Sequence, residues 1–198
     1  MTTEPGTTMP GLLHRLPGEL APHRRAIAPL AVVALVWSIW ASGPGWATPA
    51  FVVVALAGAA HGVIDARTHR LPDAVTFPAL ALTVPLLALA ALGYRDAGRL
   101  GQSLAGAVVL GAAYLALHLV NPRGLGLGDV KLAVLLGLPA GWAGWDAVWW
   151  AGVLPFLLGG LAALALLVMR RANRSTAISF GPWMLLGAAL ALSLARLG

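Results

Sequence analysis

The feature that most constrains the fold is a succession of apolar stretches, separated by short polar segments, that runs through most of the chain. Hydrophobic residues make up 59% of the 198 residues, charged residues make up only 10%, and the mean hydropathy is +0.83. A soluble domain of this length cannot bury so much apolar surface. The composition therefore predicts an all-α fold, a polytopic membrane helix bundle.

Seven of the apolar stretches are candidates for transmembrane helices, each of which needs about 20 residues to cross the hydrocarbon core. They cover residues 26–42, 47–64, 74–93, 102–120, 130–145, 147–168 and 178–196. Residues 1–25 are predicted to form a polar cytoplasmic tail, and residues 26–198 one membrane-embedded domain whose first stretch is an anchor rather than a cleaved signal. The fifth stretch is short and contains Pro139, so we expect it to be kinked or partly buried among its neighbours.

The basic residues predict the orientation of the bundle. With the N-terminus in the cytoplasm and the C-terminus outside, ten of the 13 Lys and Arg residues lie on the cytoplasmic side, as the positive-inside rule requires. These ten are Arg15, Arg24, Arg25, Arg67, Arg70, Arg123, Lys131, Arg170, Arg171 and Arg174. Membrane orientation thus explains the basic composition, and we predict a lipid bilayer rather than nucleic acid as the surrounding partner.

Three of the seven acidic residues, Asp65, Asp73 and Asp129, are predicted to lie at the cytoplasmic edge of the bundle. Asp65 ends the second stretch, and Asp129 precedes the fifth in the sequence GLGLGDVKL, residues 124–132. Because two spans separate them, the chain has returned to the same side of the membrane. The two carboxyl groups can therefore meet at one depth and form a dyad.

Two neighbouring carboxyl groups cannot both ionise at low cost, so such a pair shares a proton. The ionised member can take a proton from water, and the protonated member can polarise a scissile carbonyl. The chain has no cysteine, which excludes disulfides, thiolate nucleophiles and cysteine zinc sites, and we predict neither metal nor cofactor. Two other arrangements stay open: Asp65 could pair with Arg67 or His69, and Asp129 with Lys131.

Gly126 and Gly128 have no Cβ atom, so they would let a neighbouring helix or a substrate backbone approach closely, or allow a strained turn before Asp129. A plain interhelical loop is the alternative interpretation. No predicted strand precedes these glycines, which argues against a phosphate-binding loop.

Three blocks resemble the type IV prepilin peptidases, membrane aspartic proteases of the GxGD type. The first is DARTHRLPD, residues 65–73, with the span that follows it; the second is residues 124–132; the third is ISFGPW, residues 178–183. The resemblance covers roughly residues 47–196. It implies that Asp65 and Asp129 are the catalytic aspartates, that Asp73 caps the helix after it, and that Lys131 screens charge near the dyad or meets lipid phosphates. It also implies that Gly126, Gly128, Gly181 and Pro182 shape the site.

The same resemblance implies the substrate, a prepilin-like protein with a short basic leader, a glycine before the cut and an apolar helix after it. Ser179 departs from the proline usual in the third block, which we expect to affect substrate fit without touching either acid. Larger members carry a cysteine-containing domain linked to N-methylation. Since this chain has no cysteine, we expect a short, peptidase-only form associated with Flp/Tad-type pilins, with any methylation carried out by another protein.

Two other functions are considered. One is a non-enzymatic membrane component of pilus or secretion assembly, and the other is a small proton-coupled transporter, since intramembrane carboxylates also relay protons. The sequence has no inverted repeat and no acid near the middle of a span, which argues against the transporter.

Overall fold

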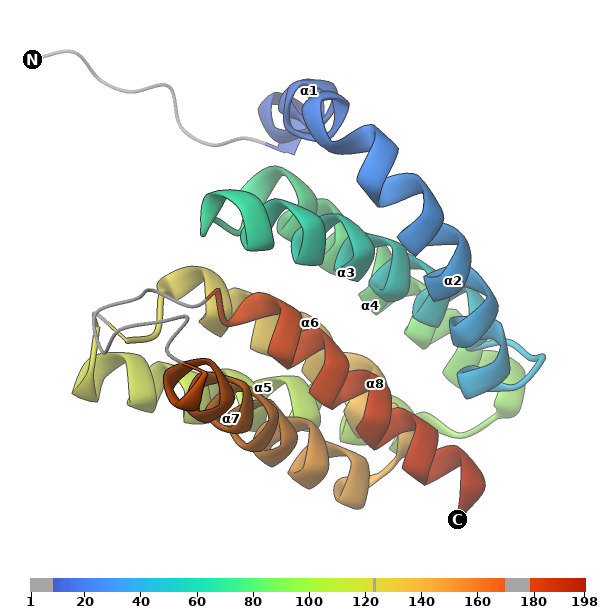
Figure 1. The fold of residues 1–198 in the computed structure, drawn as a ribbon. Helices are drawn as coiled ribbons and strands as arrows, with labels where there is room; N and C mark the ends of the chain where they lie inside the picture. The colour runs from blue at the N-terminus through green and yellow to red at the C-terminus, as the bar shows by residue number, and fades with distance from the viewer. Residues whose placement is uncertain (1–8, 123, 170–178) are drawn as a thin grey trace, which may run out of the picture.

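The computed structural model describes residues 9–122, 124–169 and 179–198. Every regular element in them is helical (Figure 1). The elements are α1 (Met9–Leu20), the short 3-10 helix η1 (Ala21–His23), α2 (Arg24–Ser42), α3 (Thr48–Thr68), α4 (Asp73–Tyr94), α5 (Ala97–Val120), α6 (Leu127–Ala143), α7 (Trp145–Val168) and α8 (Gly181–Leu197). Helices α2 to α8 correspond to the seven predicted stretches, so the predicted all-α bundle is confirmed. Arg123, Arg170, Arg171, Arg174 and Ile178 lie outside the described residues.

Five helical segments among the described residues are long and apolar enough to cross a membrane: Leu13–Ser42, Thr48–Thr68, Asp73–Tyr94, Ala97–Val120 and Trp145–Val168. Helices α6 and α8 are shorter, at 17 residues each. The length and apolar character of these segments are those of a multi-pass membrane protein.

Helix α1 was not among the predicted elements, because the first 25 residues are polar overall. Within α1, however, Leu16 and Leu20 are one turn apart and pack against the core of the bundle, while Leu13 is exposed. Residues four apart share one helix face. This face lies on α4, so part of the segment predicted as a tail is folded onto the bundle.

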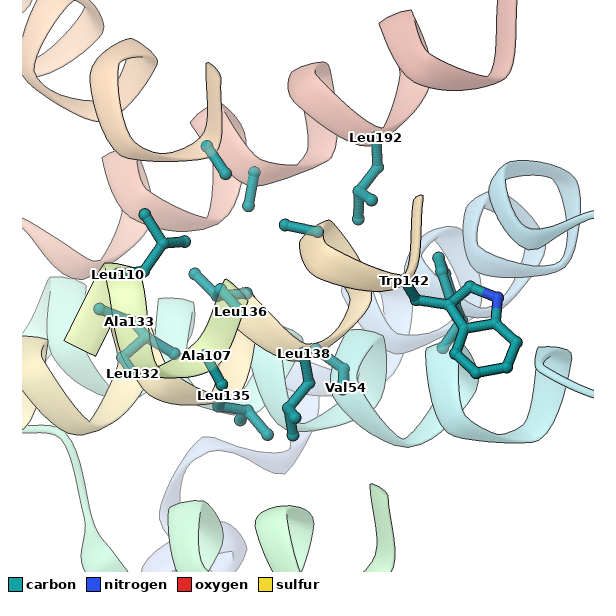
Figure 2. Packing of buried hydrophobic residues seen from close by; sticks show 14 of the residues in the cluster. Val54, Ala107, Leu110, Leu132, Ala133, Leu135, Leu136, Leu138, Trp142 and Leu192 are labelled. Carbon is teal, nitrogen blue, oxygen red and sulfur yellow. The ribbon is translucent and has the colours of Figure 1, made fainter. Parts of the chain in front are cut away.

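Helix α6 forms the centre of the bundle. Eleven of its 17 residues are buried, including Pro139, which confirms that the short fifth stretch is enclosed by its neighbours. Figure 2 shows side chains of α6 in one cluster with Val54 of α3, Leu110 of α5 and Leu192 of α8. Because α6 contacts five other helices, its position determines where the residues at its N-terminus lie.

Glycines let α5 and α6 approach each other closely. A Cβ atom added to Gly106 of α5 would lie 2.7 Å from the Gly137 carbonyl oxygen and 2.8 Å from the Gly141 Cα atom of α6. A Cβ atom added to Gly137 would lie 2.6 Å from the Ala107 Cα atom. Ser103 of α5 also donates a hydrogen bond of 2.7 Å to the Leu138 carbonyl oxygen across this contact. Small residues and interhelical hydrogen bonds are the usual means by which membrane helices associate.

Gly106→Ala is therefore expected to destabilise the protein by about 1–3 kcal/mol, because the added methyl group meets backbone atoms that cannot rotate away. The matched control is Gly101→Ala on the same helix, where nothing lies within 4 Å of an added Cβ atom. That change should leave the stability equal or slightly higher, since alanine favours helix over glycine. Thermal unfolding in detergent measures both variants, and equal melting temperatures for the two would contradict the close contact.

Candidate active site

Several helix termini lie at the same end of the bundle (Figure 1). The C-terminal ends of α3 and α5 lie there with the N-terminal ends of α4, α6 and α8. Asp65 is in the last turn of α3, and Asp129 is in the first turn of α6. Helices α3 and α6 are in contact, so the two acids come from neighbouring helices. Both residues are buried, with 5% of Asp65 and 9% of Asp129 exposed.

The Asp65 carboxylate is held by the segment that begins α8. Its Oδ2 atom accepts a hydrogen bond of 2.9 Å from the Gly181 backbone N–H and a short one from the Ser179 hydroxyl. Gly181 is the first residue of α8, so this carboxylate lies at the positive end of the helix dipole. The prediction that the departure at Ser179 touches neither acid is wrong, because the α3 and α8 ends lie side by side.

The Asp129 carboxylate is held by the start of its own helix. Its Oδ2 atom accepts a hydrogen bond of 2.8 Å from the Gly126 backbone N–H, which is the acidic half of a capping box. In both residues the oxygen that accepts these hydrogen bonds is Oδ2. Each carboxyl group is therefore oriented through that oxygen atom.

Lys131 and Asp73 form an ion pair beside the acids. The Lys131 Nζ atom lies 2.7 Å and 2.9 Å from the two Asp73 carboxylate oxygens, and 5.1 Å from the centre of the Phe77 ring. The predicted capping role of Asp73 is wrong: Pro72 is the N-cap residue of α4, and no side chain caps that terminus. The alternative pairing of Lys131 with Asp129 is also wrong, since Lys131 is bonded to Asp73 instead.

One alternative pairing of Asp65, with Arg67, is absent. The Arg67 Nη1 atom lies instead 3.4 Å from His23 Nδ1. The other alternative pairing, of Asp65 with His69, stays a prediction.

The predicted roles of the glycines are met in part. A Cβ atom on Gly128 would lie 3.0 Å from Leu71 Cβ, which is the close approach of a neighbouring segment. Gly126 has an ordinary φ of −80°, and neither glycine is among the described residues with positive φ, so the prediction of a strained turn is wrong. Gly181 is the most restricted of the three, because an added Cβ atom would lie 2.6 Å from Asp65 Oδ2.

His61 supports the Asp65 segment and was not predicted. It lies one turn before Asp65 on α3, is fully buried, and joins α3 to α4. Its Nδ1 atom lies 2.7 Å from the Ala57 carbonyl oxygen and its Nε2 atom 2.8 Å from Thr76 Oγ1. A carbonyl only accepts, so Nδ1 carries a proton and donates to Ala57. The spacing of four residues between His61 and Asp65 is the signal that could have revealed it.

Two hollows flank the acids. An apolar groove of about 500 Å³ runs between α2, α3 and α8, and its lining includes Ala66 and Pro182, the neighbours of Asp65 and Gly181. A polar hollow of about 390 Å³ lies between α1, the start of α4 and the start of α6, and its lining includes Gly128, Asp73 and Lys131. Sequence neighbours of the acids thus line one apolar and one polar hollow.

Comparisons with known proteins identify the family of the chain. The model of the type IV leader peptidase family matches residues 50–169. A prepilin leader peptidase/N-methyltransferase of Aeromonas salmonicida (strain A449) is 33% identical over 153 residues, which cover 75% of this chain and 50% of that protein. The protein of the same name from Escherichia coli (strain K12) is 38% identical over 133 residues, covering 66% of this chain and 56% of that protein.

The chain spans about half the length of the curated relatives it matches. No solved structure matches it. Because the family model covers more than half of the chain, and the matched region contains both Asp65 and Asp129, the chain belongs to the type IV leader peptidase family.

Proposed function

We propose that this chain is a membrane aspartic endopeptidase that removes the basic leader of type IV pilin-like precursors. The observation that carries the proposal is the pair Asp65 and Asp129, two buried carboxyl groups on the contacting helices α3 and α6 at one end of the bundle. Each is anchored through its Oδ2 atom, by the start of α8 and the start of α6 respectively. Paired carboxyl groups are the machinery of aspartic proteases.

In the proposed reaction, the ionised aspartate removes a proton from a water molecule held between the two acids. The water oxygen bonds to the scissile carbonyl carbon, while the protonated aspartate gives its proton to the carbonyl oxygen. The tetrahedral intermediate then collapses, the C–N bond breaks, and the amine leaves with a proton from the dyad. The fixed Oδ2 atoms orient both carboxyl groups, and the remaining oxygens act on water and substrate.

The surroundings of the acids suit a substrate with an apolar helix on one side of the cut and a polar leader on the other. The groove whose lining includes Ala66, next to Asp65, is lined mainly by apolar residues and matches the first part. The polar hollow, which includes Glu19 and Asp73 together with Arg15 and Arg70, matches a region exposed to water. With the N-terminus in the cytoplasm of an inner-membrane protein, these acids lie at the cytoplasmic face. The substrate class we favour is Flp/Tad-type pilins.

Co-expression of the full chain with a Flp/Tad-type prepilin tests the proposal. The expected result is a shortened pilin whose mass, measured by mass spectrometry, gives a new N-terminus immediately after the glycine that ends the leader. A prepilin in which that glycine is replaced by a bulky residue serves as the substrate control and should stay uncut. An unprocessed pilin, found intact beside a well-expressed and membrane-inserted enzyme, would contradict the proposed activity.

A further inference from the structure

Tyr114 of α5 carries a hydroxyl group that the surrounding protein does not satisfy. Only 2% of the residue is exposed, and its Oη atom is buried without a hydrogen-bond partner among the described residues. Buried polar groups in folded proteins almost always have a partner, and leaving one without it is costly. A hydroxyl retained in such a place is expected to have a partner that binds from outside the chain.

The position of Tyr114 indicates what that partner is. Its ring lies 5.5 Å from the ring of Phe156 and 6.4 Å from the ring of Phe180. Phe180 stands between Ser179 and Gly181, the two residues that donate hydrogen bonds to Asp65. Tyr114 is on α5 and Asp129 is on α6, and these helices pack closely: a Cβ atom added to Gly111, one turn before Tyr114, would lie 2.6 Å from Val134 of α6. The tyrosine is therefore on a helix packed against the one that carries Asp129, and its ring packs against the segment that holds Asp65.

The reaction needs a donor at this place. When water adds to the scissile carbonyl, the electron pair of the C=O π bond moves to oxygen, and a donor fixed in advance in a water-poor site stabilises the developing charge. Asp65 and Asp129 are occupied with the water proton and the proton given to the carbonyl. A tyrosine hydroxyl can donate to the same oxygen without losing its own proton, so no bond of the tyrosine forms or breaks.

We propose that Tyr114 is a further catalytic residue, whose hydroxyl donates a hydrogen bond to the carbonyl oxygen of the scissile peptide as that carbon becomes tetrahedral. This proposal rests on the peptidase function proposed above. It assigns α5 a part in the site, in addition to α3, α6 and α8.

Tyr114→Phe tests the proposal, because it removes only the hydroxyl. Cleavage of a purified prepilin by the full-length protein in detergent should show kcat reduced by about 10²–10³-fold, as for other donors to a developing oxyanion, with KM nearly unchanged. The melting temperature should stay equal or rise, since the variant no longer buries an unpaired polar atom. The matched control is the other tyrosine of the chain, Tyr94. Its hydroxyl accepts a hydrogen bond of 3.1 Å from the Trp46 backbone N–H at the opposite end of the bundle. Tyr94→Phe should cleave normally.

A Tyr114→Phe enzyme with kcat within about twofold of the wild type would overturn the proposal, and so would a loss of activity that follows a lowered melting temperature. Asp65→Asn is assayed in parallel to separate this outcome from failure of the function itself. Suppose that the wild type and Tyr114→Phe both cleave the prepilin while Asp65→Asn does not. In that case only the role of Tyr114 is wrong. If the wild type does not cleave, or Asp65→Asn cleaves fully, the peptidase function is wrong.

Discussion

Asp65→Asn and Asp129→Asn are each expected to lower the rate of prepilin cleavage by about 10²–10⁴-fold, the usual contribution of a positioned acid or base. Asparagine has the same shape as aspartate, and its carbonyl oxygen can still accept the bonds from Ser179, Gly181 or Gly126 that hold the native side chains. The fold should therefore persist while the proton transfer is lost. The measurement is the initial rate of leader removal, with membrane insertion and melting temperature determined for each variant.

The control for the dyad variants is Asp146→Asn, which removes an acid that is exposed at the other end of the bundle, in the first turn of α7. It should cleave at the wild-type rate. The assignment of the dyad is contradicted if either buried variant, present in the membrane at normal amounts, cleaves as fast as Asp146→Asn does.

Gly181→Ala is expected to lower cleavage by at least about tenfold, the second large effect. The added Cβ atom would lie 2.6 Å from Oδ2 and 3.1 Å from Cγ of Asp65, so the carboxyl group or the start of α8 must move. A displacement of about 1 Å at a reacting group can reduce a rate about 10²-fold. Because alanine is favourable in a helix, the melting temperature should change far less than the rate does.

Gly160→Ala is the matched control for this prediction. Gly160 lies on α7, where nothing is within 4 Å of an added Cβ atom, so its substitution should leave both the rate and the melting temperature close to those of the wild type. If Gly181→Ala cleaves the prepilin at the wild-type rate, the close contact with Asp65 is unimportant for catalysis.

The helices could be predicted because the membrane requires a repeated length of apolar sequence. Each predicted stretch falls within a few residues of one of α2 to α8. Helix α1 escaped prediction because its buried face consists of little more than Leu16 and Leu20 within a polar segment. Two leucines one turn apart are too weak a pattern to indicate a helix before its packing surface on α4 is known.

The two acids could also be located from the sequence, because an even number of spans between them returns the chain to the same side. The groups that form hydrogen bonds around the acids could not be located in this way. Ser179 and Gly181 lie 114 and 116 positions from Asp65, and His61 meets Thr76 on another helix. In a soluble protein the apolar stripe of a helix shows which face is buried, but membrane helices are apolar on all faces, so that pattern is missing.

By itself, the sequence determined the class of fold, the seven apolar helices α2 to α8 and the end of the bundle at which Asp65 and Asp129 lie, since these depend on hydrophobic length and on counting spans. Only the tertiary structure decided which groups hold each carboxylate, that Asp73 pairs with Lys131 instead of capping α4, and that Tyr114 packs against Phe180, beside the residues that hold Asp65. The physical reason is that hydrogen bonds and close glycine contacts act over a few ångströms. They are therefore determined by which helix faces meet, and no local pattern in the chain encodes that.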